Sequence, residues 1–227
     1  MHTLLSKSFR EAAGDYRHLL EKGYPEKSVH KLVGDRYALS GTQRTMLYRG
    51  IATPGEARKR REKLLAGSIP EKARLFIDAL NVMLTIGSYL NGNTVYLSAD
   101  GLLRDASEIH GKAFRRDLLE RSARILASHI KKLPGPSLVF VIDAPSTQST
   151  YVRNILENTF MGMHQETDVL LVPSADAYLK KMRDGILCTS DSRLIDAAIL
   201  PVLDLARACL EYHYETDWLD LDTLFPE

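Results

Sequence analysis

Aspartate is the residue type with the most chemical potential in this chain, because it recurs at or just after short apolar runs. The aspartates and the runs that they close or follow are Asp78 (73–78), Asp143 (138–142), Asp176 (169–172) and Asp191 (186–188). Carboxylates that are brought together repel one another unless a cation lies among them. Hard oxygen ligands suit Mg²⁺ or Mn²⁺, which bind through a few carboxylates together with substrate phosphate. We therefore expect these aspartates to be the metal ligands and catalytic groups of a phosphodiester hydrolase.

Neutral polar residues near the aspartates are candidates for orienting them. Asn81 lies one helical turn after Asp78, where it can hold water or a ligand oxygen. Ser174, Thr189 and Ser190 can orient carboxylates or contact phosphate from a second layer around the site.

Each aspartate also has a purely structural interpretation. Asp176 and Asp191 are ordinary residues for the start of a helix, and Asp143 before Ala-Pro is common in turns. The combination of all of them with the spacing Asp78-x-x-Asn81 favours the functional interpretation.

The elements that must position these residues are strands that alternate with helices. The apolar runs, separated by helix-compatible stretches, are 73–78, 138–142, 169–172, 186–188 and 201–205. This alternation predicts an α/β fold in which a parallel sheet is sandwiched between helices. In such a sheet the carboxyl ends of all strands lie on one edge, so the aspartates are expected to converge there.

The pattern differs in two further segments. Residues 94–104 predict a hairpin around Asp100-Gly101. The acidic and apolar residues that alternate over 217–222 predict a packed C-terminal segment.

The N-terminal part predicts a small all-α domain that precedes the sheet. Apolar residues recur at helical spacing over 4–21, a second helix can open at Pro25, and a third covers 42–49 after a turn at 39–41. This spacing resembles a helix-turn-helix. The linker at 66–70 divides the chain into a basic helical domain, 1–70, and a nuclease-like domain, 71–227.

The charge is distributed unevenly along the chain. Residues 1–72 carry 15 Lys or Arg and 8 Asp or Glu, whereas residues 73–227 carry 15 and 21. A basic segment predicts contact with a polyanion such as a nucleic acid. Two solvated surfaces that attract each other are the alternative.

The cations that we expect to contact nucleic acid lie in the helical domain and in and after the hairpin. They are Arg36, Arg44, Arg49, Arg58, Lys59, Arg60, Arg61, Arg104, Lys112, Arg115 and Arg116. Nearby, Asp105 is a candidate further ligand and His110 a candidate proton donor, although a loop histidine is more often a surface group.

At its aspartates the chain resembles the PIN-like nuclease superfamily, in particular the NYN branch. The matching segments are Phe76–Asn81, Val139–Ala144, Ser174–Leu179 and Cys188–Leu194, within residues 73–205. The resemblance implies a metal-dependent ribonuclease that acts on single-stranded or structured RNA. The chain departs from the NYN pattern in two places. Ala79 and Leu80 stand where a glycine and an aromatic residue are usual, and the inserted hairpin has no clear counterpart in the family.

The helical part resembles an uncharacterised prokaryotic family that precedes such domains. The resemblance rests on the segments 21–25, 32–37 and 47–50. It implies an architecture and no mechanism.

Several classes of protein are disfavoured. Cys188 and Cys209 form no zinc or disulfide pattern, and no apolar run is long enough for a signal peptide or a membrane span, so we expect a cytoplasmic protein without membrane contact. A dinucleotide-binding glycine motif and a P-loop are both absent from the sequence. A homo-oligomer is compatible with the sequence. The alternative function is a catalytically inactive PIN-like platform or adaptor that binds RNA.

Overall fold

The computed structural model describes residues 4–107, 115–163 and 166–225. The chain divides into two compact units. The α/β unit comprises Lys63–Gly92 and Ile109–Thr216, and the helical unit comprises Met1–Glu62, Asn93–Glu108 and Asp217–Glu227. The expected division at residue 70 therefore needs a correction: the hairpin segment and the C-terminal segment group with the N-terminal helices.

Within the described residues, the α/β unit is built on a sheet of five parallel strands in the order β5-β4-β1-β6-β7. The strands are β1 (Arg74–Asp78), β4 (Ser137–Asp143), β5 (Thr167–Val172), β6 (Ile186–Cys188) and β7 (Val202–Leu203). β1 and β4 are buried almost throughout, as apolar runs in a sheet covered on both faces should be. The predicted parallel sheet between helices is confirmed.

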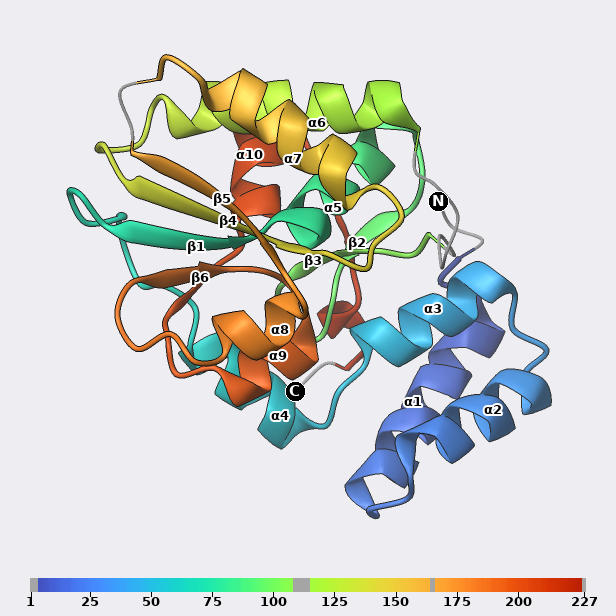
Figure 1. Cartoon of the computed structure of the whole chain (residues 1–227). Helices are drawn as coiled ribbons and strands as arrows, with labels where there is room; N and C mark the ends of the chain where they lie inside the picture. The colour runs from blue at the N-terminus through green and yellow to red at the C-terminus, as the bar shows by residue number, and fades with distance from the viewer. Residues whose placement is uncertain (1–3, 108–114, 164–165, 226–227) are drawn as a thin grey trace. The chain divides into compact units, whose positions relative to one another are not determined.

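Helices cover both faces of this sheet (Figure 1). One face carries α5 (Ala79–Leu90), α6 (Arg116–Ile130), α7 (Ser149–Phe160) and α10 (Leu205–His213), and the other carries α8 (Ala175–Leu179) and α9 (Ser192–Ala197). The chain builds β4 and β5 on one side of β1 and then returns to build β6 and β7 on the other. Because crossover connections are right-handed, this reversal places α8 and α9, which connect β5 to β6 and β6 to β7, on the opposite face. The switch point lies between β1 and β6.

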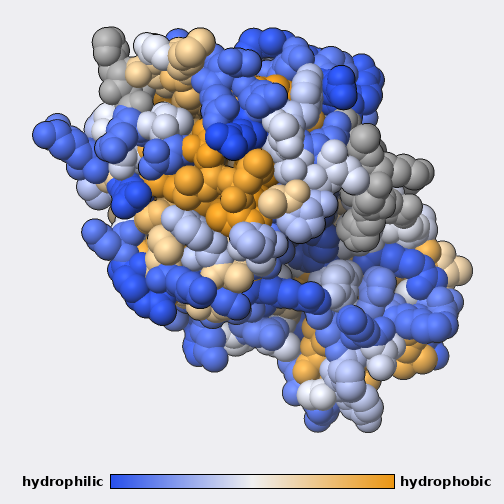
Figure 2. Space-filling model, viewed as in Figure 1, coloured by the Kyte–Doolittle hydropathy of each residue, from blue (hydrophilic) through white to orange (hydrophobic). Residues whose placement is uncertain are grey.

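The two edges of the sheet differ. Along β7, the segment next to Lys63 covers the edge, because Val202 N–H donates to Lys63 O at 2.8 Å and Leu65 N–H donates to Val202 O at 2.8 Å. No described strand pairs with the outer edge of β5, whose residues Val169–Val172 are only half-buried. Figure 2 shows apolar surface gathered where β5 runs. This edge is therefore the open, apolar one.

The helical unit packs α1 (Lys7–Glu21), α2 (Glu26–Arg36) and α3 (Gly41–Gly50) around Phe9, Tyr16 and Leu47, which are fully buried. Ser40 begins α3 with a capping box to Gln43. α4 (Pro54–Glu62) follows. The predicted order of helices is confirmed.

A small sheet in the order β3-β2-β8 completes this unit. β2 (Val95–Leu97) and β3 (Leu103–Asp105) form the predicted antiparallel hairpin. β8 (Leu219–Asp220) pairs with β2 in parallel, and the 3-10 turn η1 (Asp222–Leu224) follows. Leu221 is fully buried, so the expected packed C-terminal segment is confirmed.

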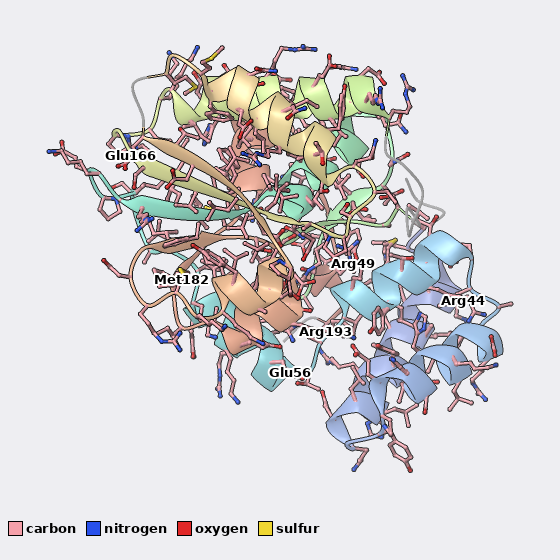
Figure 3. The ribbon with its side chains drawn as sticks, in the orientation of Figure 1. Arg44, Arg49, Glu56, Glu166, Met182 and Arg193 are labelled. Atoms are coloured by element: carbon pink, nitrogen blue, oxygen red, sulfur yellow. The ribbon has the colours of Figure 1, made fainter. Side chains whose placement is uncertain are left out.

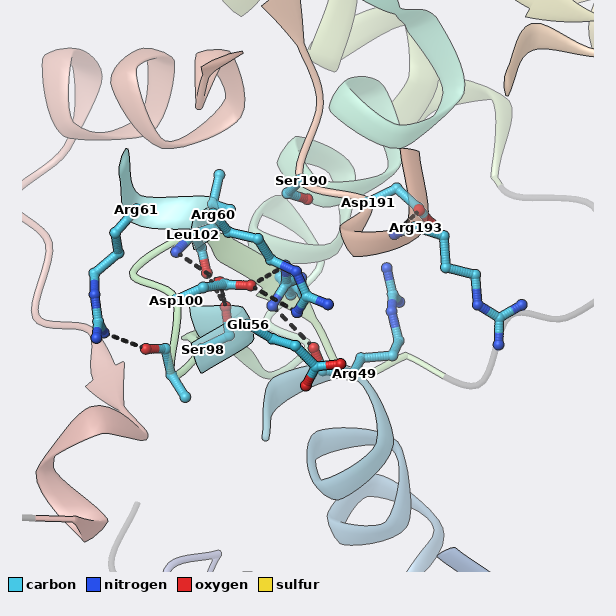
Figure 4. A network of polar contacts seen from close by, with 12 residues as sticks. Arg49, Glu56, Arg60, Arg61, Ser98, Asp100, Leu102, Ser190, Asp191 and Arg193 are labelled. Atoms are coloured by element: carbon cyan, nitrogen blue, oxygen red, sulfur yellow. Dashed lines mark hydrogen bonds and ion pairs between the residues drawn. The ribbon is translucent and has the colours of Figure 1, made fainter. Parts of the chain in front are cut away.

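Asp100 explains why the hairpin belongs with the helices. Its Oδ2 lies 2.8 Å from Arg104 Nη2 and 3.3 Å from Arg60 Nη1 of α4, and its Oδ1 accepts the Ser98 hydroxyl at 2.6 Å (Figure 4). All four side chains are buried. Buried charges need such partners, so this network fixes the hairpin to α4.

No helix in the described part of the chain is long and apolar enough to cross a bilayer.

Candidate active site

The carboxyl ends of β1 and β6 meet at the switch point, and one hydrogen bond joins them. The Thr189 hydroxyl donates to Asp78 Oδ2 at 3.0 Å, and Asp191 N–H donates to Thr189 Oγ1 at 3.1 Å. Asp78 Oδ1 also accepts Asn81 N–H at 3.4 Å, which caps α5. Thr189 therefore fixes Asp78 and the backbone of Asp191 relative to each other.

Asn81 is held by the same connection. Its Oδ1 accepts Ser190 N–H at 2.9 Å and the Ser190 hydroxyl at 3.3 Å. Because the amide oxygen is occupied in this way, the donor group Nδ2 is the part of Asn81 that stays available to a ligand. Sequence reasoning placed Asn81, Thr189 and Ser190 near the aspartates, and the structure brings these residues together.

The ends of β4 and β5 are joined in a similar way. Asp143 Oδ1 accepts Ala175 N–H of α8 at 2.7 Å. Ser174 caps α8, since its hydroxyl accepts Ala177 N–H at 3.2 Å. Asp176 is therefore not the capping residue, and its exposed carboxylate makes no hydrogen bond or ion pair with any described residue. Asp176 nevertheless lies in the first turn of α8, so its predicted place at the start of a helix is confirmed, although the capping residue is Ser174.

Asp191 caps the N-terminus of α9, which is the structural role predicted from its sequence context. Its Oδ1 accepts Arg193 N–H at 2.8 Å and Leu194 N–H at 3.0 Å, which begins α9. Neither of these bonds uses Oδ2. One oxygen of this carboxylate is thus occupied by the cap.

The carboxylates lie close enough to influence one another. Burial raises the pKa of Asp78 to about 7, with further upward contributions from the charges of Asp191 and Asp176, while the Thr189 hydrogen bond opposes the rise. Partial desolvation also raises the pKa of Asp176, although the residue is exposed overall, and the charges of Asp191 and Asp143 raise it further. The aspartates from four strand ends therefore form one electrostatic group, which we call the carboxylate site: Asp78, Asp143, Asp176 and Asp191.

The chemistry of this donor set fits a hard divalent cation in part. The described residues hold no group of three His, Cys, Asp or Glu side chains that could bind an ion by themselves. Mg²⁺ keeps several waters and binds through one or two carboxylates plus substrate phosphate, so it needs no complete protein cage. A cation would also favour the ionised form of Asp78, whose pKa is raised. The residues therefore fit an ion whose coordination is completed by water and substrate.

Two of the cations expected to contact nucleic acid are not available to it. Arg60 and Arg104 are 9% and 2% exposed, and both bind Asp100. The expectation for these two residues is corrected, because a buried guanidinium that neutralises a buried carboxylate cannot reach an external phosphate.

Other expected cations are engaged within the helical unit. Arg44 and Arg49 both project from α3 (Figure 3). Arg44 lies 2.8 Å from Asp35 and also donates to Leu39 O, and Arg49 lies 3.2 Å from Asp105. Asp105 is thus an ion-pair partner of Arg49 and lies outside the α/β unit. α3 is largely packed, so an exposed recognition helix is not what the structure presents.

The remaining expected cations lie at the surface. Arg61 is exposed, donates to Ala99 O at 2.6 Å and lies 3.6 Å from Asp222. The other exposed members are Arg36, Arg58, Lys59, Arg115 and Arg116. Lys112 and His110 lie outside the described residues.

The uneven charge along the chain disappears when the compact units are compared. The helical unit carries 14 Lys or Arg and 14 Asp or Glu, and the α/β unit carries 16 and 15. The acidic hairpin and tail neutralise the basic helices, as Asp100, Asp105 and Asp222 show in their ion pairs. A helical unit with a strong positive charge is therefore a wrong expectation.

Lys180 and Arg193 are basic residues beside the site that sequence reasoning missed. Both lower the pKa of Asp176, against the larger effect of burial. Their spacing was a usable signal, because Lys180 follows Asp176 by four residues and Arg193 follows Asp191 by two.

Comparisons with known proteins give a family and no activity. A family model described as "Domain of unknown function (DUF5616)" matches residues 69–208, which include the whole carboxylate site. A second, described as "Protein of unknown function (DUF434)", matches residues 8–63. An uncharacterised protein of Methanocaldococcus jannaschii is 23% identical over 206 residues, which cover 90% of this chain and 98% of that protein. No solved structure matches.

Proposed function

The chain belongs to the family described as a domain of unknown function (DUF5616), and we propose that its α/β unit is a metal-dependent ribonuclease. The observation that carries the proposal is the carboxylate site at the switch point of a parallel sheet. Ligands of such sheets bind at the carboxyl ends of the strands, at the point where the strand order reverses. Asp78 and Asp191 lie on either side of that point, and Thr189 joins them.

The proposed reaction is hydrolysis of a phosphodiester bond. Water attacks phosphorus, the bond to the leaving oxygen breaks, and that oxygen takes up a proton. Mg²⁺ or Mn²⁺, when bound, would neutralise charge on the phosphoryl group and lower the pKa of water. One or two carboxylates of the carboxylate site (Asp78, Asp143, Asp176 and Asp191) would hold the ion, and water and substrate would complete its coordination.

The chain's own residues prepare the site. Thr189 holds the Asp78 carboxylate through a charged hydrogen bond, and Ser190 turns the Asn81 amide so that its Nδ2 can donate to a phosphate oxygen. Asp143 and Asp191 each keep a second oxygen that the helix N–H groups do not use. These contacts preorganise oxygen ligands before the substrate arrives.

Cleavage of RNA tests the proposal. The full chain, purified to constant specific activity, should cut a labelled single-stranded or hairpin RNA with Mn²⁺ or Mg²⁺ and not with EDTA. Asp78→Asn and Asp191→Asn should abolish cutting, and Asp191→Asn should keep the fold because asparagine also caps helices. Asp168→Asn is the matched control, since Asp168 is exposed on β5 away from the carboxyl ends.

The inactive platform is the competing outcome of the same experiment. If wild type and both site variants bind RNA equally and none cuts, the α/β unit is an RNA-binding platform. If all variants cut like wild type, the activity belongs to a contaminant and the proposal is wrong.

The RNA contacts of the helical unit, the cellular location and the oligomeric state are also proposals. We propose that RNA contacts the helical unit through the exposed cations Arg36, Arg58 and Lys59, and that the protein acts in the cytoplasm. Homo-oligomer formation also stays a prediction, and the open apolar edge of β5 is the surface on which to test it.

A further inference from the structure

The carboxylate site raises an electrostatic problem for its proposed substrate. A group of aspartates repels the phosphates of RNA, and an ion at the scissile phosphate does not neutralise the charges of the phosphates on either side. A polyanion is held near such a site only where cations flank it. Basic residues at the border of the carboxylate site are therefore the place to look for substrate contacts.

Lys180 stands at one border. It follows Asp176 by one helical turn, and its backbone N–H donates to Asp176 O at 3.1 Å, so the two side chains project from the same side of α8. Lys180 is exposed and makes no ion pair with any described residue. Its ammonium group acts on Asp176 at longer range.

Arg193 stands beside Asp191. Its backbone N–H is held by Asp191 Oδ1 at 2.8 Å, which fixes where the residue begins α9. The guanidinium extends away from the Asp191 carboxylate (Figure 4), and the residue is exposed. The backbone of Arg193 is thus fixed beside Asp191, while its guanidinium group lies farther from the Asp191 carboxylate, at the surface.

We propose that Lys180 and Arg193 bind the phosphates of single-stranded RNA that flank the scissile phosphate. The inference rests on the proposed function for the identity of the site. Arginine can bind a phosphate through two parallel hydrogen bonds and lysine acts as a point charge, so both suit a backbone contact without base specificity. These residues are positioning residues that hold the strand across the carboxylate site.

Lys181 provides the matched control. It is adjacent to Lys180 in sequence and is exposed, and it lies outside the four-residue spacing that places Lys180 on the same side of α8 as Asp176. If α8 and α9 were merely charged, solvated helices, Lys180 and Lys181 would respond alike to substitution.

The experiment compares Lys180→Glu, Arg193→Glu and Lys181→Glu in the full chain. The kinetic substrate is a labelled single-stranded 12-mer RNA at saturating Mn²⁺, and RNA binding is measured by fluorescence anisotropy in EDTA over a range of salt. Lys180→Glu and Arg193→Glu should each raise KM about tenfold with kcat within about threefold, and each should reduce the salt slope of binding by about one. Lys181→Glu should match wild type within about twofold.

A dinucleotide separates phosphate binding from a structural effect. Its one phosphate occupies the scissile position, so the flanking contacts are absent. Lys180→Glu and Arg193→Glu should therefore leave its kcat/KM within about threefold of wild type. A loss on the dinucleotide as large as the loss on the 12-mer would overturn the inference.

The outcomes also separate this inference from the proposed function. If wild type cuts RNA and the two site variants behave like Lys181→Glu, the inference fails and the ribonuclease stands. If wild type does not cut but both variants lose RNA binding, the ribonuclease fails and the phosphate contacts stand. If wild type neither cuts nor binds RNA, both are wrong.

Discussion

The Thr189 hydroxyl donates a hydrogen bond to Asp78 Oδ2 at 3.0 Å, although the two residues are 111 positions apart in the sequence. This bond crosses the switch point between β1 and β6. Thr189 also accepts Asp191 N–H at 3.1 Å, so one hydroxyl sets the geometry of two aspartates.

Thr189→Val keeps the shape of the side chain and removes the hydroxyl. The hydrogen bond stabilises the charged form of Asp78, so its loss should raise the pKa of Asp78 above about 7. We expect the acid limb of the pH profile of kcat/KM to move up by about one pH unit, and Mn²⁺ affinity to fall about tenfold or more. Thr189→Ser retains the donor and should behave like wild type. A pH profile that does not move in Thr189→Val would show that this bond has no role in the site.

The metal-free protein should lose stability as the pH rises from about 4 to about 7. The pKa of Asp78 is about 7 in the folded protein and 3.8 for an unperturbed aspartate. Between those values the unfolded chain releases a proton that the folded protein keeps, so the free energy of unfolding falls with pH. The full difference corresponds to about 4 kcal/mol.

Thermal unfolding in EDTA at a series of pH values measures this effect. Asp78→Asn removes the titrating group and should flatten the curve over that range, whereas the exposed Asp168→Asn should not. Identical curves for wild type and Asp78→Asn would contradict the burial of an ionisable group at this position.

Asp100→Asn should destabilise the helical unit strongly. The substitution leaves the buried guanidinium groups of Arg60 and Arg104 without their carboxylate. Breaking a buried ion pair on one side costs about 3 kcal/mol or more. Calorimetry should show a lower Tm for Asp100→Asn, whereas Asp222→Asn, which affects an exposed pair with Arg61, should shift Tm by less than about 2 °C. Equal effects of the two substitutions would argue against the Asp100 network.

Charge reversal along α4 should give two different results. Arg58→Glu and Lys59→Glu change exposed side chains, so they should weaken RNA binding and reduce its salt slope without loss of stability. Arg60→Glu places a second carboxylate against buried Asp100 and should unfold the helical unit instead. Anisotropy titrations and thermal scans of the three variants check this. An unchanged salt slope in Arg58→Glu and Lys59→Glu would leave α4 as a solvated surface.

The sequence was sufficient for the sheet because its strands are continuous apolar runs with helical stretches between them. The hairpin could also be predicted from the sequence, since Asp100-Gly101 is a common turn pair. Gly101 has φ of +81°, a conformation that favours glycine. Local pattern decides these features, so no knowledge of distant contacts was needed.

Other features depend on partners that are remote in sequence. The sequence shows that Arg60 and Arg104 are basic, but their burial follows from Asp100, which only the folded chain brings to them. The same contacts place the hairpin and tail with the helices and cancel the apparent charge asymmetry. Lys180 and Arg193 each follow an aspartate closely in sequence, but both matter because the fold brings Asp176 and Asp191 together, and these two aspartates are separate in the chain.

The most direct test of the central claim is the position of Mn²⁺ in crystals of the full chain, located from its anomalous scattering. We expect a peak at the carboxyl edge of the sheet, within coordination distance of Asp78 or Asp191, and the loss of this peak in Asp78→Asn. Manganese bound only at other surfaces, with this edge empty at saturating concentration, would contradict the proposal that these aspartates form a metal-dependent active site.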